Sequence, residues 1–127
     1  MDRRHRYTIY VTTQIVSEPQ DGHFDVAVTT FKLMADKTRL RIIWALLNGE
    51  HSVNELAAQL SLNPAGVSQH LAKLRLSHLV SVRRDGTRSY YSLDNAHVRD
   101  LVEQALFHAD HVASDEPIDE AAHRARA

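Results

Sequence analysis

The sequence predicts a mainly α-helical fold that carries one β-hairpin. Apolar residues recur at helical spacing through most of residues 24–112, and two β-rich runs between residues 79 and 93 meet at the pair Asp85-Gly86. An Asp-Gly pair between two such runs is a strong hairpin signal. At 127 residues the chain is expected to form one domain with a modest core.

The composition excludes several classes of protein. It is 43% hydrophobic and 24% charged, which is ordinary for a globular domain. No apolar run approaches the roughly 20 residues that span a bilayer, and the N-terminus lacks the apolar block of a signal peptide. We therefore expect a cytoplasmic protein with no membrane partner. The absence of cysteine excludes disulfides and thiolate metal sites.

Both ends of the chain are expected to be flexible. Residues 1–22 form an N-terminal arm with a basic tip, a weak strand pattern over residues 7–16 and a turn pattern over residues 19–22. Residues 113–127 are acidic and small and form a tail. The folded domain is therefore expected over residues 23–112.

Two helices are expected at the start of this domain, over residues 24–34 and 38–47. Asp36 is a good N-cap for the second helix, and the Asn-Gly pair that follows residue 47 ends it. Phe31 and Trp44 stand at core spacing, so we expect both side chains in the core.

The stretch over residues 52–75 predicts two short helices joined by a tight turn. The first opens with Ser52 and Glu55, a capping-box pattern. The second begins with Asn63, a good N-cap, and Pro64, which suits a first helical turn. Its apolar residues share one face, and its other face is polar and cationic. The pattern is typical of a helix-turn-helix, with an ordinary helical hairpin as the alternative.

Basic residues flank the turn of the predicted β-hairpin, namely Arg83, Arg84 and Arg88. Between residues 73 and 88, five basic residues stand against one acidic residue. Such a local positive charge suits contact with phosphates. A cationic ribbon after a helix-turn-helix is the wing of a winged helix. The sequence therefore predicts a winged helix-turn-helix that binds double-stranded DNA, with its second helix in the major groove.

A last helix is expected over residues 95–112, with a broad apolar face that calls for a partner. His97, His108 and His111 fall within about 60° of one another beside that face. His97 and His108 are roughly 16 Å apart along the helix axis, too far to share a metal ion within one chain. Two copies packed antiparallel across a two-fold axis bring the three histidines together twice per dimer. We therefore expect a homodimer through the first and last helices.

Three imidazoles with a carboxylate suit a divalent metal ion such as zinc, nickel or cobalt. The alternative is that the histidines form an inert solvated edge, and that the regulator has a different inducer or none. A metallohydrolase would need a general-base motif such as HExxH, which the sequence lacks. We therefore expect no enzyme and no small organic substrate.

With these features in place, residues 31–111 resemble the ArsR/SmtB family of metal-sensing repressors. The matching segments include VSQHLAKLR and NAHVRDLVEQALFHADH. The family's last-helix metal site reads Asp-x-His, ten residues, then His-x-x-His or His-x-x-Glu. The resemblance therefore implies His97, His108 and His111 as ligands. The aspartate position holds Asn95; the nearby carboxylates are Asp94, one residue earlier, and Asp100, one turn after His97.

Within the family, the segments HVRDLV and ADH are similar to the nickel/cobalt-sensing branch, which favours those ions over zinc. The Glu-His ligand pair of that branch corresponds to Asp110 and His111, although Asp110 points about 100° away from its neighbour on a helix. That branch also recruits histidines from the tail, which implies His123. His5 or His23 can contribute in the same way from the N-terminal side.

The resemblance also implies the residues that face DNA, which are Asn63, Pro64, Ala65, Ser68 and Gln69. Of these, Ser68 and Gln69 offer hydrogen bonds to base edges, whereas Pro64 and Ala65 offer only apolar contact. His70 lies close by but can instead face the neighbouring helix, and Lys73 adds a cation. The family's cysteine motif is absent, which argues against arsenic or cadmium sensing through it. The implied function is a repressor that releases its operator when metal binds.

Overall fold

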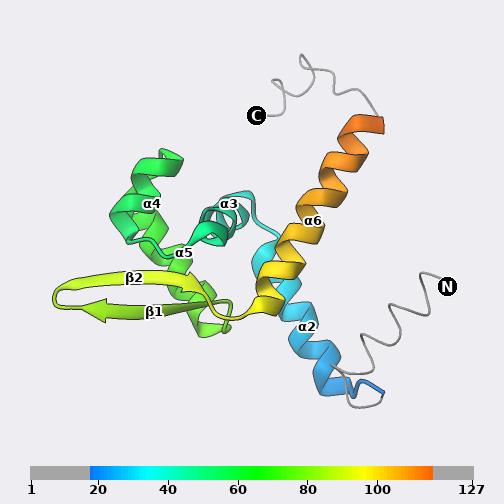
Figure 1. Cartoon of the computed structure of the whole chain (residues 1–127). Helices are drawn as coiled ribbons and strands as arrows, with labels where there is room; N and C mark the ends of the chain where they lie inside the picture. The colour runs from blue at the N-terminus through cyan, green and yellow to red at the C-terminus, as the bar shows by residue number, and fades with distance from the viewer. Residues whose placement is uncertain (1–17, 116–127) are drawn as a thin grey trace.

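The structure, a computed structural model, describes residues 18–115. Its elements are α2 (Asp21–Met34), α3 (Lys37–Ala45), the 3-10 turn η1 (Leu46–Asn48), α4 (Val53–Leu60), α5 (Pro64–Leu76), β1 (Val80–Asp85), β2 (Arg88–Leu93) and α6 (Ala96–Asp115). The β-hairpin projects from one side of the molecule, and the second half of α6 projects from the opposite side (Figure 1). The strand pattern over residues 7–16 lies outside the described residues.

Two helices extend beyond their predicted ends. α2 already begins at Asp21, inside the stretch expected to be a turn, because Gln20 and His23 cap it reciprocally. The backbone N–H of Gln20 donates to Nδ1 of His23 at 2.8 Å. At the other end, α6 runs three residues past its predicted limit, and the Ser114 hydroxyl donates to the Asp110 carbonyl at 2.9 Å. Residues 21, 22 and 113–115 therefore belong to helices.

The helix-turn-helix has the predicted caps. The Ser52 hydroxyl accepts from the backbone N–H of Glu55 at 3.2 Å, and the Glu55 carboxylate accepts from the N–H of Ser52 at 3.1 Å. Ser61, the C-cap residue after α4, adopts the left-handed conformation (φ 55°). Arg41 on α3 donates to the carbonyl of Leu60 at 3.0 Å. These contacts fix the turn that sets the direction of α5.

The core lies where α3, α4, α5, the base of the hairpin and the first half of α6 meet. Its buried side chains are Met34, Ile42, Ile43, Ala45, Leu46, Leu56, Ala57, Leu60, Val67, Leu71, Leu74, Leu79, Val80, Val98 and Val102. The α5 members of this set share one helical face, as the spacing predicts. Their burial turns the polar face of α5 outward.

The β-hairpin is confirmed, but its turn lies one residue further along than the sequence indicates. Asp85 pairs with Arg88, so the two-residue loop is Gly86-Thr87. Gly86 has φ 62°, while Thr87 is not among the residues with positive φ. Glycine at the first loop position is the requirement of a type II′ turn, whereas a type I′ turn needs positive φ at both positions.

The prediction that Phe31 and Trp44 lie in the core is wrong for the single chain, in which their side chains are 58% and 46% exposed. Other large apolar side chains on α2 and α6 are exposed as well, namely Phe24, Val26, Val28, Phe107 and Val112. Helical periodicity marks a face for burial but does not say which chain covers it. None of the helices within residues 18–115 is long and apolar enough to cross a membrane.

Replacing Leu71 with Ala is expected to lower the free energy of unfolding by about 2–5 kcal/mol, because it leaves a cavity under α5. Urea denaturation at one fixed protein concentration measures the effect. Lys73→Ala, on the exposed face of the same helix, is the matched control and should stay within about 0.5 kcal/mol of the parent. Equal midpoints for the two variants would contradict the burial of α5 described above.

Candidate nucleic-acid interface and metal centre

The outer face of α5 carries small and polar side chains, and Pro64, Ala65, Ser68, Gln69 and Lys73 are all exposed there. Asn63 is exposed at the start of the helix, where its side-chain oxygen accepts from the backbone N–H of Ala65 at 2.8 Å. The cap uses this oxygen and leaves the amide nitrogen to donate elsewhere. Six of the predicted DNA-facing residues are thus exposed on or beside α5.

His70 is placed differently from its neighbours on α5. Its side chain is half-buried, and its Nδ1 atom is buried without a hydrogen-bond partner. It lies close enough to Asp36, the N-cap of α3, to act on that carboxyl electrostatically. The backbone N–H of Arg39, donating at 2.9 Å, is the main cause that lowers the pKa of Asp36. Of the two orientations left open by the sequence, the ring therefore takes the one that faces α3.

The three predicted wing cations have unequal surroundings. All three are exposed, but Arg84 and Arg88 take part in no ion pair within the described part of the chain. Arg83, in contrast, donates to Glu50 through Nη2 at 2.6 Å and through Nε at 3.2 Å. Its guanidinium also lies 4.8 Å from the centre of the Tyr90 ring. Sequence reasoning missed Glu50 because it lies 33 residues from Arg83.

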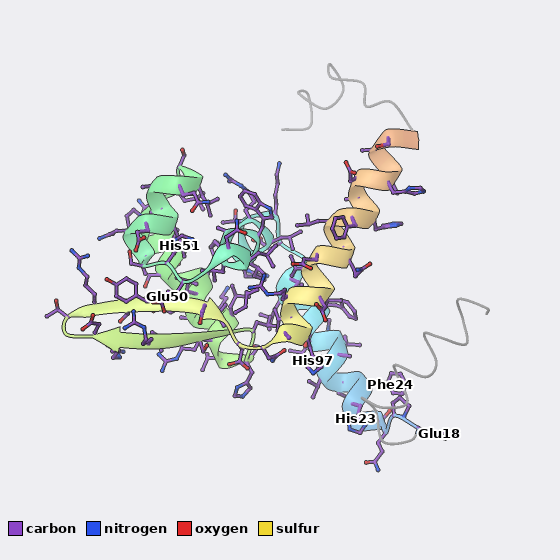
Figure 2. The ribbon with its side chains drawn as sticks, in the orientation of Figure 1. Glu18, His23, Phe24, Glu50, His51 and His97 are labelled. Atoms are coloured by element: carbon purple, nitrogen blue, oxygen red, sulfur yellow. The ribbon has the colours of Figure 1, made fainter. Side chains whose placement is uncertain are left out.

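The Glu50–Arg83 pair changes the proton affinity of both partners. The hydrogen bonds from Arg83 lower the pKa of the Glu50 carboxyl, and the same contact raises the pKa of Arg83. Figure 2 shows Glu50 and His51 together beside the hairpin. Both ions therefore stay charged at neutral pH and hold the hairpin to the segment before α4.

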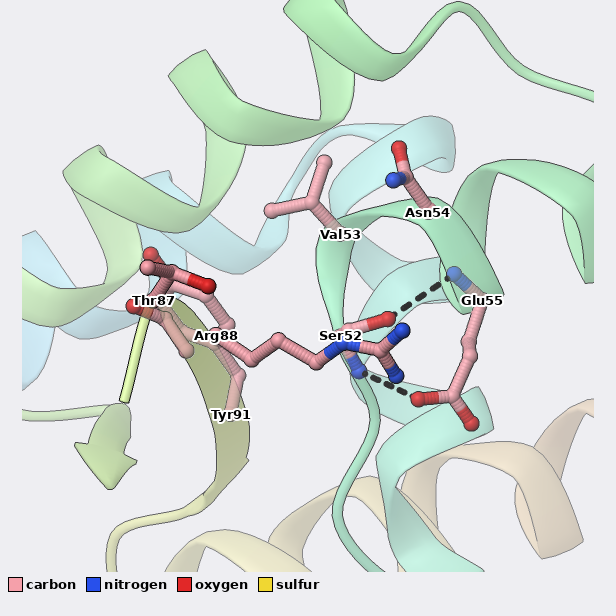
Figure 3. Close-up of a pocket in the computed structure, with 8 residues that line it drawn as sticks. Ser52, Val53, Asn54, Glu55, Thr87, Arg88 and Tyr91 are labelled. Carbon is pink, nitrogen blue, oxygen red and sulfur yellow. Dashed lines mark hydrogen bonds between the residues drawn. The ribbon is translucent and has the colours of Figure 1, made fainter. Parts of the chain in front are cut away.

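An open pocket of about 450 Å³ separates the wing from the start of α4 (Figure 3). Arg88 and Tyr91 line it from β2, and Glu55 of α4 and its N-cap Ser52 line it from the other side. The Glu55 carboxylate already accepts the capping bond from the backbone N–H of Ser52, which lowers its pKa, and its other oxygen lies 3.7 Å from Nδ1 of His51. This carboxylate is therefore committed to the local fold.

The predicted metal ligands His97, His108 and His111 are exposed along α6. Figure 2 shows His97 at the beginning of that helix. Within residues 18–115 of one chain, no three histidine, aspartate or glutamate side chains come close enough to hold a metal ion. The three imidazoles suit a divalent ion chemically, but a site built from them needs a second chain.

The start of α6 separates the roles of Asn95 and Asp94. The Asn95 side-chain oxygen accepts from the backbone N–H groups of His97 and Val98, at 2.9 and 3.1 Å. Its two lone pairs are thus used as a helix cap, and it would have to leave the cap to bind a metal. Asp94 is an exposed carboxylate that accepts one bond, from the Asn95 amide at 3.3 Å. Of the two residues, Asp94 therefore has more oxygen lone pairs available for a metal ion.

Of the remaining predicted histidines, one takes part in a helix cap and two lie outside the described residues. His23 stands at the start of α2, where its Nδ1 atom takes part in the helix cap. His5 and His123 lie in residues that the structure does not describe.

Comparisons with known proteins agree with a DNA-binding regulator. The arsR family of bacterial regulatory proteins matches residues 36–82, which run from α3 into β1. The regulator KmtR of Mycobacterium tuberculosis is 50% identical over 91 residues, which are 72% of this chain and 70% of that protein. A homologue of the cadmium resistance regulator CadC from Staphylococcus aureus is 41% identical and covers 71% of this chain and 74% of its own length.

A solved structure agrees with the fold. The homodimeric winged helix-turn-helix DNA-binding domain of a possible ArsR-family regulator from Mycobacterium bovis superposes with a TM-score of 0.71 and 27% identity. The match covers 81% of this chain and 98% of that one. The outward face of α5, the hairpin and these similarities lead to one assignment. The chain belongs to the arsR family of transcriptional regulators, which are DNA-binding proteins and not enzymes.

Proposed function

We propose that this protein is a homodimeric, metal-responsive repressor that leaves its operator when a divalent metal ion binds between two subunits. The single observation that carries the proposal is the pattern on α6, where three exposed histidines share one side of the helix without converging in one chain. Nickel or cobalt is the favoured ion, and zinc is the alternative. The site of action is the cytoplasm, where operator DNA is accessible.

The uncovered apolar side chains support the homodimer. Phe24 and Phe31 on α2 and Phe107 on α6 are each more than half exposed. An isologous interface buries the same patch on both subunits, so one contact covers the two helices of each chain. The similar solved domain from Mycobacterium bovis is described as homodimeric.

In the proposed complex, α5 of each subunit enters one major groove. Ser68 and Gln69 read base edges by hydrogen bonds, and Pro64 and Ala65 make apolar contact, for instance with a thymine methyl group. The proposed phosphate contacts are Asn63, through its amide nitrogen, Lys73, Arg84 and Arg88. His70 then acts as support, because its ring faces α3.

The proposed metal site lies between antiparallel α6 helices. His97 of one protomer comes beside His108 and His111 of its partner, and the two-fold axis creates a second identical site. Asp94 is the proposed carboxylate ligand, because the Asn95 oxygen atom is occupied by two backbone N–H groups. His123 from the tail is proposed to complete a five- or six-coordinate site, which nickel and cobalt accept more readily than zinc.

Metal bound in this way ties the two subunits together and changes the spacing of the two α5 helices. Half-sites on DNA lie about one helical turn, or 34–36 Å, apart, so a small change of spacing breaks the match. Linkage requires operator DNA to weaken metal binding by the same factor as metal weakens DNA binding.

The second candidate is a winged-helix regulator whose histidines are inert and whose inducer is different or absent. The use of Asn95 as a helix cap at the family's ligand position favours this alternative. Titration of the dimer with nickel, cobalt and zinc separates the two candidates. The absorption spectrum of the cobalt form also reports the coordination number.

Replacing Gln69 with Ala is expected to reduce the preference for operator over random DNA by about 1–3 kcal/mol, because a base contact is lost.

Replacing Arg84 with Ala is expected to weaken binding to both DNAs about equally and to lower the salt dependence. Fluorescence anisotropy with an operator selected from random duplexes measures both effects. A change of specificity in the Arg84 variant alone would contradict the assignment of the wing.

The intersubunit metal site is tested by mixing two variants, His97→Ala and the double variant His108→Ala/His111→Ala. Each homodimer is expected to bind metal weakly and to stay on the operator. The heterodimer regains one complete set of three imidazoles, so we expect one tight site per dimer by calorimetry. A heterodimer that binds metal no better than its parents would show that the histidines are inert.

A further inference from the structure

Arg83 occupies the middle of β1, and its guanidinium is held on two sides. Glu50 accepts two hydrogen bonds from it, at 2.6 and 3.2 Å, and the Tyr90 ring lies 4.8 Å from its central carbon. Arg83 and Tyr90 are directly opposite one another in the hairpin. The planar fork of arginine matches a carboxylate in this two-bond geometry, whereas lysine cannot reproduce it.

A second contact lies beside this pair and joins the same two parts of the chain. His51, the neighbour of Glu50, forms an isolated bridge with Tyr91 on β2. Its backbone N–H donates to the Tyr91 carbonyl at 3.0 Å, and its carbonyl accepts from the Tyr91 N–H at 2.8 Å. The segment before α4 therefore holds the hairpin by its backbone at the base and by a side-chain pair further out.

The next cation along the strand has a different environment. Arg84 points to the opposite face of the ribbon, because side chains alternate along a strand. Arg84 and Arg88 are exposed, and neither is ion-paired within residues 18–115. The hairpin thus carries two cations available to DNA and one that is already neutralised.

We propose that Arg83 is a positioning residue of the wing and not a phosphate contact. Its pair with Glu50 stays closed on DNA and sets the angle at which the wing presents Arg84 and Arg88 to the backbone. The inference rests on the proposed function to the extent that operator DNA is the partner of the wing. It assigns to Glu50, outside the helix-turn-helix, a part in DNA binding.

Electrostatics favour the closed pair on DNA. Transfer of Arg83 to a phosphate would break two charge-assisted hydrogen bonds and the contact with Tyr90. It would also leave the carboxylate of Glu50 unpaired next to a polyanion, where like charges repel. The closed pair avoids both costs and keeps the wing ordered before DNA arrives, so less conformational freedom is lost on binding.

The salt dependence of DNA binding tests this assignment, because each lost phosphate contact lowers the slope of log K against log salt by about 0.9. We expect Arg84→Ala to lower the slope by that amount. Arg83→Ala should keep the wild-type slope and lose about two- to fivefold in affinity at every salt concentration, as expected for an exposed pair. A slope lowered by about 0.9 in the Arg83 variant would overturn the proposal.

A conservative variant and a double-mutant cycle sharpen the test. Arg83→Lys keeps the positive charge, which would be enough for a phosphate contact, but loses the two-bond fork. We expect it to bind DNA as weakly as Arg83→Ala, whereas wild-type affinity would overturn the proposal. In the Arg83→Ala background, Glu50→Gln reports only the long-range effect of removing the Glu50 charge. In the wild-type background the same substitution also breaks the pair, so DNA binding should be weakened relative to that reference. Stronger binding in the wild-type background only would mean that Glu50 competes with DNA.

Nuclear magnetic resonance of the Glu50 carboxyl carbon tests the pair directly. In the free protein, Arg83→Ala should raise the pKa of Glu50 towards its ordinary value, and Arg84→Ala should leave it unchanged. With saturating operator DNA, the pKa of Glu50 in the wild type should stay below its value in the DNA-bound Arg83→Ala variant, which experiences the same phosphates, and equal values in the two complexes would overturn the proposal. If the wild type binds no DNA specifically, the proposed function fails, yet the response of Glu50 to Arg83→Ala still reports the pair in the free protein.

Discussion

The burial of one face of α5 is the interaction on which the rest of the molecule depends. Val67, Leu71 and Leu74 are almost completely buried, and α5 packs against α3, α4 and β1. Because a helix is rigid and its side chains point in fixed directions, burial of these three residues determines which residues face outward. The result is an exposed surface of mainly small and polar groups, with Leu76 exposed at its end, and the same packing turns His70 towards α3. One face of α5 therefore supports the fold, and the other face is available for contact with DNA.

The β-hairpin is attached to the helical core through an ion pair as well as through backbone hydrogen bonds. A two-stranded hairpin alone is only marginally stable in water, so its attachment matters. The bridge between His51 and Tyr91 and the pair between Glu50 and Arg83 join it to the segment before α4. The wing thereby acquires a defined direction relative to α5. In the proposed complex, this order is what allows the two remaining cations to contact phosphate without first being immobilised.

The length of α6 imposes a second constraint, which in the proposed dimer links assembly to metal sensing. A helix separates residues by about 1.5 Å each, so side chains eleven residues apart cannot meet in one chain. The same helix carries apolar side chains that this chain leaves exposed, including Phe107 and Val112. In the proposed dimer, one interface covers the apolar face and completes the metal site. Metal binding and subunit geometry are then inseparable, which is the requirement for a metal to act on DNA binding.

The sequence by itself determined the order and type of the elements, the capping box at Ser52, the hairpin and the family resemblance. These features depend on periodicity and on hydrogen bonds between residues that are close in the chain. Only the tertiary structure decided that Arg83 is paired with Glu50, that His70 faces α3, and that Phe31 is uncovered. Each of these depends on groups that are far apart in sequence or on the absence of a covering group. Local patterns specify what a residue prefers, and the packing of distant segments decides which partner it meets.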